Sequence, residues 1–126
     1  MSIRKAAIVL ALALTSCDGP NTGELTFDLS TPNDDDGAIQ FTIIATPGYE
    51  MLDLEAACAG CRVFTRPVDE RTTLGIVTGQ IGGSALLRAV VSNPGRPAAY
   101  LVTVVEVTSR TYALRSTDGY RISVSR

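Results

Sequence analysis

The chain has 126 residues, of which 45% are hydrophobic and 19% are charged, a composition typical of one folded globular domain. It carries 11 basic and 13 acidic residues, a formal net charge of −2, which argues against nucleic-acid binding because that requires a clustered excess of positive charge. Histidine is absent, so the usual general base and the usual metal ligand are both missing.

The first 16 residues have the pattern of a secretory signal peptide. Arg4 and Lys5 give a positively charged start, and residues 6–14 form an uninterrupted apolar run. This run is too short to span a bilayer, which takes about 20 residues. We therefore expect residues 1–16 to be removed, which leaves 9 basic residues against 13 acidic ones and a net charge of −4.

The apolar run ends in Leu14, Thr15, Ser16 and Cys17. This stretch resembles the lipobox of bacterial lipoproteins, in which an aliphatic residue and two small residues precede a cysteine. The resemblance implies that Cys17 is acylated and anchors the protein in membrane lipid, on the periplasmic or cell-surface side of the envelope. Two or three acyl chains hold a protein stably on a bilayer. An ordinary signal peptide, cut after Ala13, is the alternative and would leave Cys17 free.

Short strands separated by turn residues dominate the rest of the chain. Residues 17–23 comprise the lipidated cysteine and a Gly- and Pro-containing tether, and residues 24–126 show no sustained helical repeat. Residues 24–29 and 38–46 alternate apolar and polar side chains, so each predicts a strand that buries one face. Residues 49–57 fit either a strand or one helical turn.

Later segments continue this pattern. Residues 99–108 are apolar on both faces, which predicts a strand in the centre of a sheet. Seven to nine strands in about 100 residues predict a single antiparallel β-sandwich over residues 24–126, with jelly-roll or immunoglobulin-like topology. The other expected strands are residues 62–65, 74–78, 85–92 and 120–124, with a short helix as the alternative for residues 85–92.

The strand order of the mature chain resembles that of cohesin-like domains, the jelly-roll sandwiches of scaffolding proteins. The segments that carry this resemblance are ELTFDL, GAIQFTIIAT, SALLRAVVS, AYLVTVVEV and GYRISV. The resemblance implies a non-enzymatic module that binds another protein of the envelope. It rests on order and composition, and the dockerin-contacting residues of the family cannot be placed on this sequence.

A carbohydrate-binding module is an alternative within the binding class, because aromatic side chains can stack on sugars. Its candidate residues are Tyr49, Tyr100, Tyr112 and Tyr120.

Cys58 and Cys61 are separated by Ala59 and Gly60, and in an oxidising compartment this spacing predicts a local disulfide. Because the closed loop is short, the bond stabilises the domain by only about 2 kcal/mol in the chain-entropy model. The alternatives are a thiol redox protein, a metal site completed by carboxylates, and two unpaired thiols.

Carboxylates supply the remaining candidates. Asp34, Asp35 and Asp36 precede Gly37 and have the oxygen ligands that calcium prefers, but they lack the spacing of a calcium loop, so we expect an exposed, solvated turn. Paired carboxylates such as Glu50 with Asp53 or Glu55 could act as an acid and a base, but nothing in the sequence shows that they converge. We assign no catalytic residue, cofactor or metal ligand. Nothing in the chain predicts an enzyme.

Overall fold

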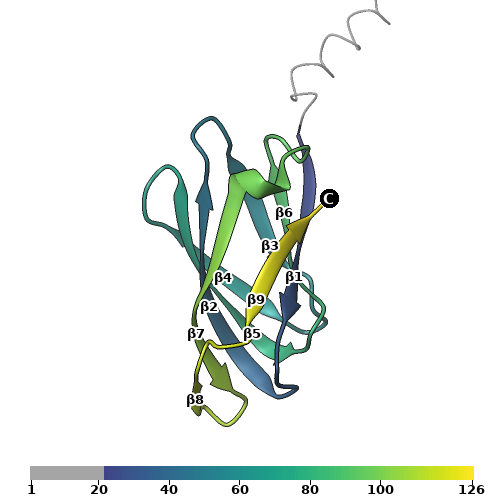
Figure 1. Ribbon diagram of the computed structural model, residues 1–126, viewed down its shortest axis with the longest axis vertical. Helices are drawn as coiled ribbons and strands as arrows, with labels where there is room; N and C mark the ends of the chain where they lie inside the picture. Colours follow the sequence, from purple (N-terminus) through teal and green to yellow (C-terminus); the bar gives the residue numbers. More distant parts are fainter. Residues whose placement is uncertain (1–21) are drawn as a thin grey trace, which may run out of the picture.

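A computed structural model describes residues 22–126 as two antiparallel sheets packed face to face (Figure 1). The four-stranded sheet has the order β3-β6-β1-β9, and the five-stranded sheet has the order β4-β5-β2-β7-β8. The predicted all-β antiparallel sandwich is therefore confirmed. Within residues 22–126, no helix is long and apolar enough to cross a membrane.

The strands agree closely with the sequence pattern. The ambiguous residues 49–57 contain a strand, and a two-residue strand at residues 114–115 lies where none was predicted. The elements are β1 (Gly23–Ser30), β2 (Asp36–Ala45), β3 (Met51–Ala56), β4 (Arg62–Pro67), β5 (Thr72–Ile81), β6 (Ala85–Val91), the 3-10 turn η1 (Pro97–Ala99), β7 (Tyr100–Ser109), β8 (Leu114–Arg115) and β9 (Arg121–Ser125).

Strand pairing is nested along the chain. The outermost strands β1 and β9 pair with each other, and β2 with β7, β3 with β6 and β4 with β5 pair in the same antiparallel way. Pairing of β1 with β6 and of β2 with β5 then joins these four strand pairs into the two sheets. This nesting brings segments from opposite ends of the sequence together and buries alternate residues between the layers.

The core lies between the inner faces of the two sheets. Because side chains alternate along a strand, β1 and β2 each send every second residue inward. Phe41 of β2 packs against Gly75 of β5, its cross-strand partner, and a Cβ at Gly75 would overlap the Phe41 ring. The buried apolar side chains are Leu25, Phe27, Leu29, Ile39, Phe41, Ile43, Ala45, Val77, Ile81, Leu86, Leu87, Ala89, Val91, Ala99, Tyr100, Val107 and Ile122.

The connecting loops gather at the two ends of the sandwich (Figure 1). The start of β1 lies beside the end of β6, where Gly23 pairs with Val91 and contacts Pro94. We call this end, which also holds the β2–β3 turn, the start end. The loop that contains Cys58 and Cys61 lies at the opposite end, which we call the far end, together with the β1–β2 and β7–β8 connections.

The prediction that residues 99–108 form a central strand is wrong. In the described part of the chain, β7 pairs with β2 along its length, but on its other side only Val107 and Thr108 have a partner, the short β8. Most of β7 is therefore an edge. Its apolar outward residues are not covered by a second layer: Leu101 is 61% exposed and Val105 is 47% exposed.

Candidate functional site

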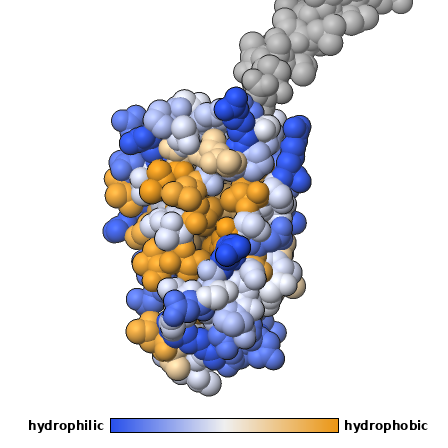
Figure 2. Space-filling view, viewed as in Figure 1, coloured by the Kyte–Doolittle hydropathy of each residue, from blue (hydrophilic) through white to orange (hydrophobic). Residues whose placement is uncertain are grey.

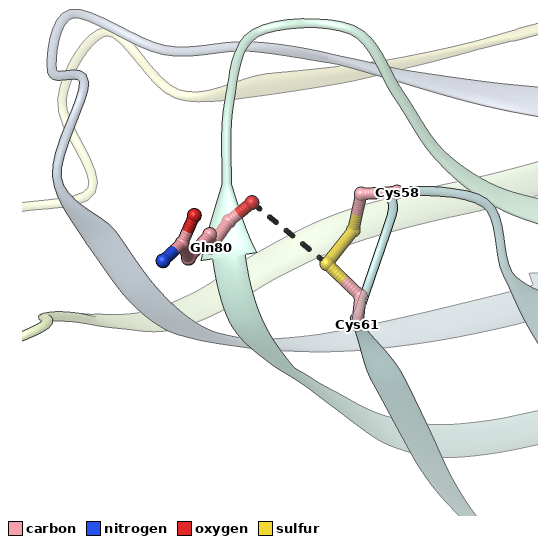
Figure 3. Close-up of a disulfide and its surroundings, with 3 residues drawn as sticks. All are labelled: Cys58, Cys61 and Gln80. Carbon is pink, nitrogen blue, oxygen red and sulfur yellow. Dashed lines mark hydrogen bonds between the residues drawn. A yellow bond between two sulfur atoms is a disulfide. The ribbon is translucent and has the colours of Figure 1, made fainter.

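Cys58 and Cys61 are joined in a disulfide at the far end of the sandwich (Figure 3). Their Cα atoms are 5.4 Å apart, and the Cys61 N–H donates to the Cys58 carbonyl at 3.1 Å, which closes a tight turn. The disulfide loop connects β3 of one sheet to β4 of the other, so it fixes a crossing between the layers. Among residues 22–126, no three Cys, Asp or Glu side chains are grouped to hold a metal ion.

Two glycines allow the disulfide loop to lie flat against β5. Gly60 has a φ of 73°, a left-handed conformation that other residues rarely adopt. Gly79, in the last part of β5, faces the loop, and a Cβ there would come within 3.0 Å of the Cys61 Cα and 3.2 Å of its Sγ. The Cys61 sulfur also lies 3.9 Å from the Gln80 carbonyl (Figure 3). These contacts favour a structural role for the bond.

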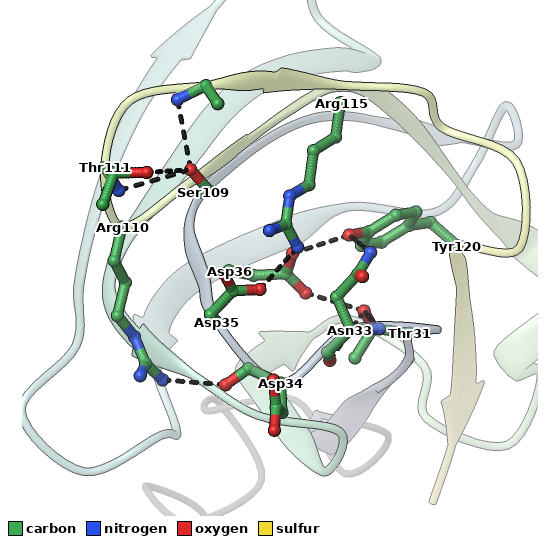
Figure 4. Close-up of polar contacts among 11 residues, drawn as sticks. Thr31, Asn33, Asp34, Asp35, Asp36, Ser109, Arg110, Thr111, Arg115 and Tyr120 are labelled. Carbon is green, nitrogen blue, oxygen red and sulfur yellow. Dashed lines mark hydrogen bonds and ion pairs between the residues drawn. The ribbon is translucent and has the colours of Figure 1, made fainter.

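A polar cluster surrounds Asp36 at the same end (Figure 4). The Asp36 carboxylate is fully buried and accepts hydrogen bonds from the Tyr120 hydroxyl at 2.6 Å and the Thr31 hydroxyl at 2.7 Å. Arg115 approaches the same carboxylate at 3.3 Å, and the Asn33 amide donates to the Tyr120 hydroxyl at 2.8 Å. The Asp36 cluster therefore ties the β1–β2 loop to β8 and to the segment before β9.

The cluster corrects one expectation from the sequence. Asp36 is not part of an exposed, solvated turn, because it begins β2 and points into the sandwich. Asp34 does remain exposed, and Asp35 forms an ion pair with Arg115 at 2.7 Å. Asp35 and Asp36 both contact the same guanidinium nitrogen of Arg115, whereas Asp34 is exposed. The three carboxylates of the described chain therefore do not group as metal ligands.

Charge at the edge of the cluster is balanced locally. The hydrogen bond from Arg115 holds the pKa of the Asp35 carboxyl below its usual value, and the same contact raises the pKa of Arg115. Asp69, in the β4–β5 turn at the start end, also has a lowered pKa, because the backbone N–H groups of Arg71 and Thr72 donate to it. Asp35 and Asp69 both lie at the surface, and their contacts stabilise the conformation of the loops that contain them.

The remaining carboxylate and aromatic candidates lie apart. Glu55 of β3 pairs with Arg88 of β6 at 3.8 Å on the outer face of the four-stranded sheet. Tyr49 and Tyr100 pack edge to face at 6.0 Å near the start end, whereas Tyr120 belongs to the Asp36 cluster at the far end. Tyr112 is 90% exposed in the β7–β8 turn. The tyrosines therefore do not form one sugar-stacking face.

The outer face of the five-stranded sheet carries more large apolar side chains than that of the four-stranded sheet, although polar pairs such as Thr42 with Thr103 lie among them. On the five-stranded sheet, large apolar side chains face outward in cross-strand pairs, Phe64 with Ile76 and Ile44 with Leu101. Their exposed fractions range from 39% for Ile44 to 61% for Leu101. We call this surface the apolar face. The corresponding pairs on the four-stranded sheet are polar or charged: Thr26 with Arg88, Asp28 with Ser123 and Ser30 with Arg121.

The view of the β7 and β9 side shows the border of the apolar face (Figure 2). Hydrophobic residues gather over β7 and extend into the gap toward β9. A groove of about 250 Å³ lies in this gap, and Val102, Val104 and Ile122 contribute its apolar lining. The sequence contained a signal for this surface, the surplus of apolar residues in 99–108, but the same surplus also predicts burial between two layers.

No protein-family model, curated protein or solved structure matches this chain. Cys17 and the expected signal peptide, residues 1–16, lie outside the described residues, as does most of the tether. The chain reaches the start end at Thr22, so five residues connect Cys17 to the sandwich.

Proposed function

We propose that this protein is a lipid-anchored, non-enzymatic module of the bacterial envelope that binds another envelope protein through its apolar face. The observation that carries the proposal is the difference between the two outer faces. A soluble sheet normally covers one face with the core and keeps the other polar. The four-stranded sheet follows this rule more closely than the five-stranded sheet, and large exposed apolar side chains gathered on one face are typical of a protein-binding site.

The anchor at Cys17 supports the same function. Five residues, 18–22, lie between Cys17 and β1 and reach at most about 18 Å when fully extended, so this tether keeps the sandwich close to the membrane surface. At this distance the start end faces the lipid, and the apolar face stands beside it, accessible to a neighbouring envelope protein.

The two alternatives have less support. A carbohydrate-binding module would need its aromatic side chains together, and the tyrosines are distributed over both ends of the sandwich. Reactive Cys-x-x-Cys pairs take their low thiol pKa from a helix N-terminus. The Cys58–Cys61 pair lies in a loop between two strands and packs against Gly79.

Replacing Cys17 by Ser is expected to abolish lipidation. Cells grown with labelled palmitate should incorporate the label into the wild-type protein, and the Cys17→Ser protein should carry none, because serine has no thiol to alkylate. Cys58→Ser is the matched control and should keep the label. A label that survives in the Cys17→Ser protein would remove the anchor from the proposal.

A photo-crosslinking residue placed at Phe64 is expected to capture a partner in intact cells. Phe64 is 58% exposed on the apolar face, on the edge strand β4. The same probe at Ser123, which is exposed on the polar outer face, is the control. We expect one dominant product from Phe64 and at least a tenfold weaker yield from Ser123. Equal products from both sites, or none from Phe64, would contradict binding through the apolar face.

A further inference from the structure

The sandwich has four sheet edges, and three of them carry features that prevent a further strand from adding. An exposed edge presents free N–H and C=O groups, and proteins protect such edges with charge, proline, bulges or very short strands. Charge and proline protect β4 through Arg62, Arg66 and Pro67. Charge also protects β3 through Asp53 and Glu55, and Arg121 lies on β9.

The fourth edge lacks this protection along most of its length. The two-residue β8 covers β7 only at Val107 and Thr108, and no other described strand pairs with this side of β7. The free stretch from Tyr100 to Val105 contains no charge and no proline, and Glu106 is its first charged residue. The one protective feature of this stretch is a register shift at its end, where Val105 has no partner on β2 between Val104, which pairs with Phe41, and Glu106, which pairs with Gln40.

The backbone of the free stretch is oriented to accept a partner. The Ala99 carbonyl accepts a hydrogen bond from the Thr46 N–H at 2.8 Å, so Ala99 faces β2. Backbone groups alternate sides along an antiparallel strand, which turns the Thr103 groups toward β2 and the Val102 groups toward the open side. The groove between β7 and β9 borders this open side: Thr103 and Val104 line it from β7, and Arg121 and Ile122 line it from β9.

We infer that this edge pairs with β7 of a second copy of the chain, antiparallel and centred on Thr103. The free stretch is self-complementary about this residue: Val102 of one copy would lie opposite Val104 of the other, and Leu101 opposite Val105. A two-fold interface requires such self-complementarity, because the same patch is contributed by both copies. Thr103 would meet its counterpart on the axis, and paired threonines are favourable across strands.

The ends of the free stretch also fit this register. Glu106 of one copy falls opposite Tyr100 of the other and not opposite another acidic residue. Val107, where β8 begins to occupy the open side, falls opposite Ala99, which precedes β7. The two five-stranded sheets would thus form one ten-stranded sheet. The inference does not depend on the anchor, and β5 and β2 separate β7 from Phe64, the probe site for a different partner.

A cysteine at position 103 tests the inference in cells that produce the full chain. Thr103 would form a non-hydrogen-bonded pair with its counterpart, at a Cα separation of about 4.5 Å, which a disulfide can bridge. Non-reducing gels should show at least ten times more dimer for Thr103→Cys than for Ser123→Cys. Absence of this dimer, or equal dimer from both variants, would overturn the inference.

A charge at the same position gives a second, independent measurement. Thr103→Lys should convert the detergent-solubilised full protein from dimer to monomer in analytical ultracentrifugation, because lysine on an edge opposes strand addition. Thr42→Lys is the matched control: Thr42 is the cross-strand partner of Thr103 on β2, on the same outer face but away from the edge. It should remain dimeric. A Thr103→Lys protein that stays dimeric would contradict pairing at this edge.

Discussion

Replacing Phe41 by Ala is expected to lower the free energy of unfolding by about 3–5 kcal/mol, since it empties a fully buried aromatic site in a central strand. Urea unfolding should show a lower midpoint with an unchanged slope. Thr42→Ala, one residue along on the outer face, is the control, and its effect should stay within about 1 kcal/mol. A Phe41→Ala protein as stable as this control would mean that the core is not packed as described.

The contact between Phe41 and Gly75 sharpens this test. Gly75→Ala alone is expected to cost about 1–3 kcal/mol, because the added methyl group overlaps the Phe41 ring. In a Phe41→Leu background the ring is gone, and the same change should cost less by at least about 0.5 kcal/mol. Strictly additive effects would show that the two residues do not share one packing site.

Replacing Asp36 by Ala is expected to destabilise the domain by about 3 kcal/mol, the lower end of the range for breaking a buried ion pair. The change removes the acceptor of the Tyr120 hydroxyl and the nearer of two acceptors of the Thr31 hydroxyl, while Arg115 keeps its contact with Asp35. Thermal and urea unfolding measure the effect.

Asp34→Ala provides the matched control for the Asp36 cluster. Asp34 is exposed, and its recorded contact is through its main-chain carbonyl, which accepts from Arg110. Removal of the Asp34 carboxylate should change the free energy of unfolding by no more than about 0.5 kcal/mol, because the main-chain contact is retained. If the two substitutions had equal effects, the buried hydrogen bonds of Asp36 would contribute nothing to stability.

The sequence predicted much of the fold because alternation is a local signal. Leu25, Phe27 and Leu29 alternate with polar residues in β1, and the structure buries all three. The spacing of Cys58 and Cys61 likewise predicted their bond. These features depend on residues close together in the chain, where the pattern of the strand or the turn determines which side chains meet.

Features that depend on distant segments were not predictable. Asp36 is buried because Tyr120 and Arg115 reach it from 84 and 79 residues away, and nothing in the local run of three aspartates indicates these partners. The apolar residues on both faces of β7 predicted a central strand. Its position at an edge follows from the chain leaving after β8 to pair β9 with β1 in the other sheet.

The direction of β7 relative to the start of the chain restricts how a pair of these domains can sit on a membrane. Both β1 and β7 run from the start end toward the far end (Figure 1). Two copies joined by antiparallel β7 strands would therefore begin at opposite ends of the assembly. With five residues between each Cys17 and β1, both proposed anchors would reach one bilayer only if the strands lay along its surface. A single copy with its strands perpendicular to the bilayer would present its far end away from the membrane. A pair with its strands parallel to the bilayer would instead present the broad side of a sheet.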